Sequence, residues 1–228
     1  MLIYFRNDIF RLIGKWFRSF GAKGGAHSAG IQKGDPDVRM GWIIIIGTIP
    51  IVLAGFFLQD IIRTSLRSLW ITAIVLIVFG LLLGLADWLG KKVKPLEAVG
   101  YRDGILVGLA QMLALIPGVS RSGASTTAGL ALGYTRPAAA RLSFLLAIPA
   151  VFGSGLYELV HSLNEPDGPY GYAETAVATV VAFGVGFAVI AFLMKYISTH
   201  SFLPFVIYRV LLGATLIVLL TLGVIQPI

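Results

Sequence analysis

The sequence contains no cysteine, which excludes disulfide bonds and any mechanism that uses a thiolate. Charged residues are also scarce: they make up 13% of the chain, whereas soluble domains carry about 25%. Hydrophobic residues account for 57% of the 228 positions. A soluble fold of this composition would expose large apolar patches and aggregate, so we expect the lipid bilayer to be the solvent of this protein.

The few charges are mostly basic and give a formal net charge of +7. Such an excess can indicate nucleic-acid binding, but Lys and Arg in the cytoplasmic loops of a membrane protein produce the same excess. We favour the second interpretation and expect no nucleic-acid partner.

Five stretches are apolar and long enough to cross a bilayer, which takes about 20 residues. They are Gly41–Leu58, Leu69–Leu89, Leu142–Val160, Ala173–Met194 and Leu203–Ile225. In residues 1–40 we expect only a partial helix, over Leu2–Ile13, and a basic cytoplasmic loop. The predicted fold class is therefore an all-α membrane protein, with residues 1–228 forming one multi-pass domain.

Residues 104–133 are apolar but interrupted by Pro117-Gly118, a pair that ends a helix. Opened backbone at membrane depth is tolerated only inside protein or beside water. We therefore expect a re-entrant hairpin of two half-helices that enters and leaves on one side. With this topology most Lys and Arg residues fall in inside loops, and the outside loops hold only Arg63 and Arg67.

A weak internal repeat relates Thr48–Gly55 to Ala147–Gly153, each with an Ile-Pro pair. Many membrane carriers consist of two related halves. The second copy has the broken hairpin upstream of its Ile-Pro pair, whereas the first copy has only a basic loop there. The sequence thus predicts one and a half copies of an inverted-repeat-like unit, in an N-terminally incomplete domain.

The break gathers groups that bind an anion. The second half-helix begins near Ser122, so its free N–H groups point at the break. Hydroxyl groups of Ser120, Ser122 and Ser125 lie nearby, and Arg121 adds a fixed charge with a planar fork of donors. The alternative is a kinked helix whose serines bond their own backbone. We favour a phosphate site, because an unpaired charge at this depth costs at least ~2.5 kcal/mol.

The segment Gln111–Gly123, with Pro-Gly-Val-Ser-Arg-Ser-Gly at 117–123, resembles the second signature of the undecaprenyl-diphosphate phosphatase family, also called bacitracin-resistance proteins. The similarity continues in Leu2–Phe5, Asp8-Ile9, Gly47–Pro50, Phe144–Pro149 and Tyr208-Arg209. It therefore covers essentially the whole chain.

The resemblance implies an enzyme that removes the terminal phosphate of a polyprenyl (undecaprenyl) diphosphate, which recycles carrier lipid for peptidoglycan synthesis and gives bacitracin resistance. It implies a multi-pass protein of the bacterial inner membrane, a cleft open to the periplasm, a divalent cation (Mg²⁺ or Ca²⁺), and a homodimer as one oligomeric state. It places Ser120 and Arg121 at the catalytic or phosphate-binding positions of the motif, and Ser125 where the family usually has Thr. We expect Ser120 and Arg121 to be catalytic, and Gly118, Ser122, Gly123, Ser125 and Arg209 to bind the substrate. For Arg209 the alternative is a side chain that snorkels towards the inner surface.

The sequence departs from the family in its first signature, which has paired glutamates, a serine-rich break and a histidine. None of the 11 acidic residues forms such a pair, and His27, His161 and His200 fall in loops. We therefore expect the metal ligands upstream of Met1, and a chain that as written is inactive or nearly so, because metal activation and proton transfer are missing. A small anion or lipid transporter is the alternative function, since half-helices and a buried Arg occur there too.

Overall fold

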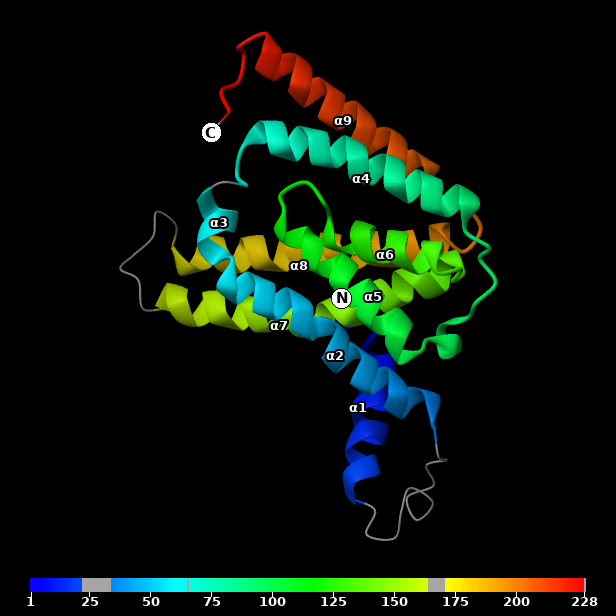
Figure 1. Cartoon of the computed structure of the whole chain (residues 1–228). Coiled ribbons are helices and arrows are strands. Elements are labelled where there is room, and N and C mark those ends of the chain that lie inside the picture. The colour runs from blue at the N-terminus through cyan, green and yellow to red at the C-terminus, as the bar shows by residue number, and fades with distance from the viewer. Residues whose placement is uncertain (22–33, 65, 164–170, 228) are drawn as a thin grey trace.

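The computed structural model describes residues 1–21, 34–64, 66–163 and 171–227, and the regular elements in these ranges are helices (Figure 1). Five of the helices are long and apolar enough to span a membrane. They are α2 (Pro36–Phe57), α4 (Leu69–Leu89), α7 (Arg136–Leu163), α8 (Tyr172–Tyr196) and α9 (Leu203–Thr221). The predicted all-α membrane fold is confirmed.

Two spans begin earlier than predicted. The helix α2 begins at Pro36 because the Asp35 side chain accepts the N–H of Asp37 at 2.8 Å and caps the helix. The helix α7 begins at Arg136. Its first two turns carry Arg136 and Arg141, so a search for continuous apolar sequence places the start of the span too late. Both arginines form ion pairs with carboxylates, so their charge does not destabilise the first turns of the helix.

The N-terminal helix α1 (Arg6–Gly21) is longer than the predicted Leu2–Ile13 and runs across the direction of the spans (Figure 1). Asp8 fixes it to α7, because Arg141 donates to both carboxylate oxygens at 2.5 and 2.6 Å. The ring of Phe5 packs on Phe144, with centroids 5.7 Å apart. Residues 22–33 of the predicted basic loop, with His27, lie outside the described residues, and residues 14–21 belong to α1.

The broken segment forms a hairpin of α5 (Tyr101–Met112), a short turn of 3₁₀ helix (Leu113–Leu115) and α6 (Arg121–Ala131). Its two feet are joined by backbone hydrogen bonds: the N–H of Val93 donates to the Gly133 carbonyl at 2.9 Å, and the N–H of Thr135 donates to the Lys94 carbonyl at 3.0 Å. The hairpin therefore returns to where it started, which confirms the predicted geometry of the broken helix pair.

Side chains strengthen this joint. Tyr134 is fully buried and donates to Asp103 of α5 at 2.6 Å, and the Lys94 ammonium lies 3.4 Å from the same carboxylate. Burial, together with the hydrogen bond to Asp103, raises the pKa of Tyr134 above its usual range. The phenol thus remains a neutral donor and keeps the feet together.

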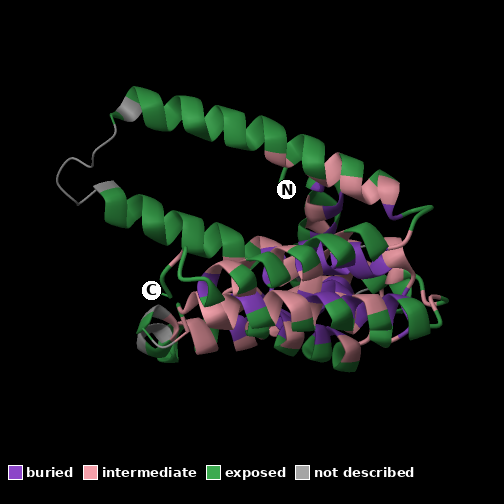
Figure 2. Ribbon diagram, turned by 90° about the horizontal axis from the view of Figure 1, so that it is seen from above, coloured by how far each residue is buried: buried purple, intermediate pink, exposed green. Residues whose placement is uncertain are grey.

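Glycines allow close approach within the bundle. A Cβ on Gly108 of α5 would lie 2.3 Å from the Gly47 carbonyl oxygen of α2, and one on Gly213 of α9 would lie 2.7 Å from that of Ala73 in α4. Small residues at such contacts are the usual basis of helix packing in membranes. By contrast, α8 and the outer half of α7 are exposed along most of their length (Figure 2).

We predict that both feet of the hairpin face the same side of the membrane. Because the chain has no native cysteine, exposed positions can be tested singly as Lys91→Cys and Ala131→Cys, with Arg67→Cys as the control on the opposite side. A membrane-impermeant thiol reagent should label Lys91→Cys and Ala131→Cys from one face and Arg67→Cys from the other. Labelling of the two feet from different faces would contradict the re-entrant arrangement.

Candidate functional site

The break between α5 and α6 holds two residues in left-handed backbone conformations. Gly118 has φ +92°, and a Cβ there would lie 2.7 Å from the Thr72 carbonyl oxygen of α4. Ser120 has φ +64°, which is uncommon for a residue other than glycine. It is also the N-cap of α6, where its hydroxyl oxygen accepts the N–H of Gly123 at 3.3 Å.

The opened backbone is held by an arginine from α9. Arg209 is 9% exposed, and its Nη2 donates to the carbonyls of Gly118 at 2.6 Å and Val119 at 3.1 Å. Gly80 of α4 makes room for it, because a Cβ there would lie 3.1 Å from the Arg209 Cβ. The guanidinium points into the break, so the snorkelling interpretation of Arg209 is wrong.

Two positive charges meet the N-terminus of α6 without a balancing negative charge. Arg121 is half-buried, and its Nε is buried with no hydrogen-bond partner; the Nε of Arg209 is in the same state. Within the described ranges, neither guanidinium forms an ion pair with a carboxylate. Together with the free N–H groups of α6 they form a site that favours an anion, and phosphate matches the donor geometry.

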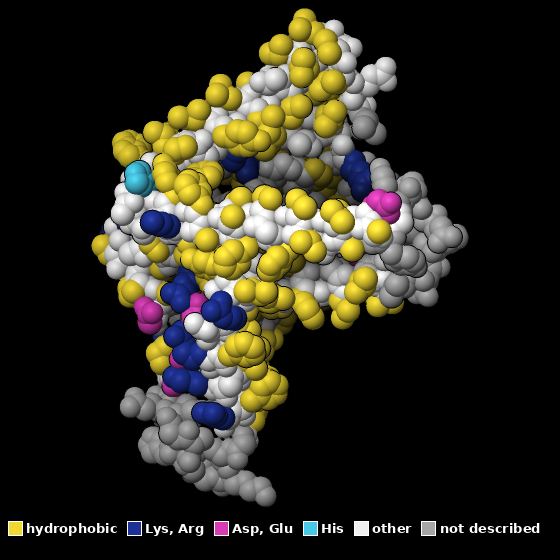
Figure 3. All heavy atoms as spheres, turned by 180° about the vertical axis from the view of Figure 1, so that it is seen from behind, with side chains coloured by type: hydrophobic (Ala, Val, Ile, Leu, Met, Phe, Trp, Pro, Cys, Tyr) yellow, Lys and Arg dark blue, Asp and Glu magenta, His cyan; other side chains and the backbone are white. Residues whose placement is uncertain are grey.

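A cleft of about 230 Å³ opens beside the break. Its lining residues are Leu83, Ser120, Ser122, Gly123, Thr126, Ala140, Phe144, Leu193, Phe202, Phe205, Tyr208 and Arg209. One wall is polar and comes from α6 and Arg209, whereas the other is apolar and largely aromatic. Figure 3 shows a hollow between α8 and the α4–α9 pair, with Lys or Arg side chains visible inside it.

The cleft brings together four of the predicted site residues: Ser120, Ser122, Gly123 and Arg209. A Cβ on Gly123 would lie 3.5 Å from Nη1 of Arg209, so the second terminal nitrogen of this arginine is close to the start of α6. Ser143 of α7 supports the same turn, because its hydroxyl donates to the Ser122 carbonyl at 3.3 Å.

The other three predicted residues lie around the cleft rather than in its lining. Gly118 contributes a carbonyl to Arg209. Ser125 is fully buried, and its hydroxyl donates to the Arg121 carbonyl within α6 at 3.0 Å. Serines in helices often donate in this way to the carbonyl four residues earlier. Arg121 is half-buried next to the cleft and is not among the residues that line it.

Sequence analysis missed the aromatic wall. Phe202 and Phe205 precede Arg209 by about two turns and one turn of helix, so all three share one face of α9. Aromatic residues seven and four positions before an arginine inside a span could have predicted an aromatic surface next to the charge. Phe144, which comes from α7, had no comparable local signal.

No three His, Asp or Glu side chains come together to hold a metal ion in the part of the chain that the structure describes. The residues that line the cleft include no Asp, Glu or His, so the described cleft does not supply side-chain ligands for the divalent cation that the resemblance implies. The same residues fit a phosphate group, for which arginine forks and helix N–H groups are suitable donors.

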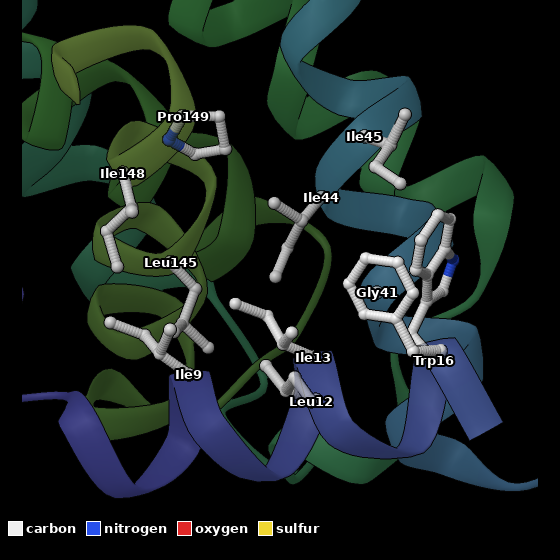
Figure 4. Close-up of a pocket in the computed structure, with 11 residues that line it drawn as sticks. Ile9, Leu12, Ile13, Trp16, Gly41, Ile44, Ile45, Leu145, Ile148 and Pro149 are labelled. Atoms are coloured by element: carbon white, nitrogen blue, oxygen red, sulfur yellow. The ribbon is translucent and has the colours of Figure 1, made fainter. Parts of the chain in front are cut away.

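A second cavity, of about 260 Å³, lies between α1, α2 and α7. Figure 4 shows its apolar lining, in which Ile9, Leu12 and Ile13 face Ile44 and Leu145. Its lining offers no charged side chain to orient a diphosphate, so the cleft at the break is the stronger candidate site.

Comparisons with known proteins identify the family of this chain. The family model described as bacitracin resistance protein BacA matches residues 1–215. A Micrococcus luteus protein named undecaprenyl-diphosphatase is 61% identical over 228 residues, covering 99% of this chain and 80% of that protein. A Clavibacter michiganensis subsp. michiganensis protein of the same name is 58% identical over 225 residues, with the same coverage. An Agrobacterium fabrum protein named undecaprenyl-diphosphatase 2 is 53% identical over 226 residues, covering 99% and 78%.

We predict that Gly118→Ala destabilises the protein strongly. A left-handed alanine costs about 1–2 kcal/mol, and its Cβ would also clash with the Thr72 carbonyl. At about 2–4 °C per kcal/mol for a chain of this size, the melting temperature in detergent should fall by about 5 °C or more. The matched control is Gly184→Ala on α8, where no atom lies within 4 Å of the new Cβ; it should melt at or above the wild-type temperature. Equal melting of both variants would refute the account of the break.

Proposed function

This chain belongs to the bacitracin resistance protein BacA family, and from that premise we propose that it hydrolyses a polyprenyl diphosphate, such as undecaprenyl diphosphate, to the monophosphate and inorganic phosphate. The observation that carries the proposal is Arg209, which lines the cleft and reaches the start of α6, together with Arg121, the first residue of α6. Neither guanidinium has a carboxylate partner in the described ranges. A diphosphate supplies the missing negative charge. The apolar wall beside it suits the hydrocarbon part of the same molecule.

The polar wall is arranged to hold the diphosphate. Arg209 is already fixed by two carbonyls, so it loses little side-chain freedom when it binds a phosphate oxygen. The hydroxyl oxygen of Ser120 accepts the Gly123 N–H, which leaves its hydrogen free to donate to the substrate. Arg121 adds a planar fork that suits two oxygens of one phosphate.

In the proposed reaction a water oxygen attacks the terminal phosphorus, and the P–O bond of the anhydride breaks. The lipid keeps one phosphate, the other leaves as inorganic phosphate, and the remaining proton of water passes to solvent. Phosphoryl transfer depends mainly on positioning and on stabilising charge over the phosphate oxygens. The two arginines and the α6 N–H groups supply both. We keep a divalent cation in the proposal, with ligands that the described residues do not provide.

We further propose that the protein acts in the bacterial inner (plasma) membrane. There it would recycle carrier lipid for peptidoglycan synthesis, support cell shape and contribute to bacitracin resistance. Five candidate spans and relatives named undecaprenyl-diphosphatase support this placement.

The sequence alone predicts an inactive chain, but the relatives named undecaprenyl-diphosphatase and the unpaired arginines lead us to expect that the purified chain releases phosphate from a polyprenyl diphosphate in detergent with Mg²⁺ or Ca²⁺ added. A transporter would release none, because no gradient exists in detergent. Arg121→Lys should lose much of the activity, since an ammonium cannot reproduce the fork. Arg121→Ala should lose more, by about 10²–10³-fold. Matched changes at exposed Arg67 should have no effect. No release by the folded protein would contradict the proposal and agree with the inactivity expected from the missing first signature.

Ser120→Ala distinguishes a hydrogen-bond donor from a nucleophile. We expect turnover to fall by about 10- to 100-fold, the size of one charge-assisted hydrogen bond. A fall of several orders of magnitude, with substrate binding intact, would instead assign the nucleophile to Ser120. Ser198→Ala, at an exposed position after α8, is the control.

A further inference from the structure

We infer that the aromatic wall formed by Phe144, Phe202 and Phe205 binds the first isoprene units of the diphosphate lipid, while the rest of the chain leaves sideways between α8 and α9. This inference rests on the proposed function, because it assigns the lipid part of the same substrate.

The aromatic wall lies at the right distance from the anion site. Phe205 precedes Arg209 by four residues on α9, which is about 6 Å along a helix axis. Phe202 and Phe205 are paired, with ring centroids 6.1 Å apart at 55°. A lipid whose phosphate lies at Arg209 would therefore place its nearest carbon atoms against these rings.

The inner end of the cleft is closed beneath this wall. Asp87, at the end of α4, is 6% exposed; it accepts from Nε of Arg136 on α7 at 2.6 Å and from the N–H of Phe202 at 3.0 Å. One carboxylate thus ties the end of α4 to the starts of α7 and α9. A hydrocarbon chain cannot pass this polar, filled junction.

The side of the cleft towards α8 is the open one. The second half of α8 packs on the core, through Ile190, Leu193, Met194 and Tyr196 and a ring contact of Phe187 with Tyr4, and the hollow in Figure 3 lies between α8 and the α4–α9 pair. Tyr208, at the edge of the cleft, is 64% exposed.

The size of the cleft limits how much lipid it can hold. Pockets that bury a drug-sized ligand measure about 300–1,000 Å³, whereas this cleft measures about 230 Å³. It has room for the phosphate end and the first isoprene units only. The bilayer must therefore hold the remaining chain, as the lateral opening allows.

The test uses a non-hydrolysable ligand, so that it does not depend on turnover. A polyprenyl methylenediphosphonate and the chain-free methylenediphosphonate are titrated into wild-type protein, Phe205→Ala and Phe205→Leu in detergent. We expect Phe205→Ala to weaken binding of the polyprenyl ligand about 10-fold or more, with Phe205→Leu in between. Binding of the chain-free ligand should not change.

Phe192→Ala is the matched control, because Phe192 is exposed on α8 outside the cleft lining. Melting temperature and gel filtration establish that each variant is folded. Equal affinity of wild type and Phe205→Ala for the polyprenyl ligand, or equal weakening for both ligands, would overturn the inference. Failure of the phosphatase proposal would appear separately, as binding without phosphate release in the wild-type protein.

Discussion

The hydrogen bonds from Arg209 to the Gly118 and Val119 carbonyls are the contact on which the candidate site depends. A chain broken at membrane depth exposes backbone groups that lipid cannot satisfy, at several kcal/mol for each group. The single Arg209 side chain donates to both exposed carbonyls through Nη2, and its other guanidinium nitrogens remain for a ligand. The close approaches at Gly80 and Gly118 make the contact sterically possible. Arg209 thus stabilises the break and is also the residue that we propose binds the anion.

Ion pairs at the other end of the bundle complete the support. Asp8 with Arg141, and Asp87 with Arg136, join helices that are far apart in the sequence. The two carboxylates are buried, so removing the arginine partner of either would leave a buried charge without its ion pair. These arginines also belong to the basic end of the molecule that the positive-inside rule places in the cytoplasm. Asp87 also accepts the N–H of Phe202, so this pair connects the ends of three helices beside the cleft.

Much of the fold could be predicted because the bilayer imposes simple rules. Apolar length identified the five spans, and Pro117-Gly118 identified the break and its hairpin. The contacts of single residues could not be predicted. The sequence shows that Arg209 lies inside a span, but it does not show what the side chain contacts. Its partners, the carbonyls of Gly118 and Val119, are about 90 residues away, and the packing of α9 on α4 brings Arg209 to them. Ser125 was predicted to bind substrate, but its hydroxyl donates to the Arg121 carbonyl within α6.

The way the hairpin is anchored favours a fixed platform over a moving gate. A carrier that alternates its access must let one element move past another. Here the feet are joined by backbone hydrogen bonds and by Tyr134 with Asp103, while the tip is held by a charged donor from α9. Moving the tip would expose two carbonyls and a guanidinium to lipid at the same time. Catalysis of phosphoryl transfer needs the opposite property, which is donors held in place before the charge develops. The rigidity of this break is therefore a physical reason to prefer hydrolysis over transport.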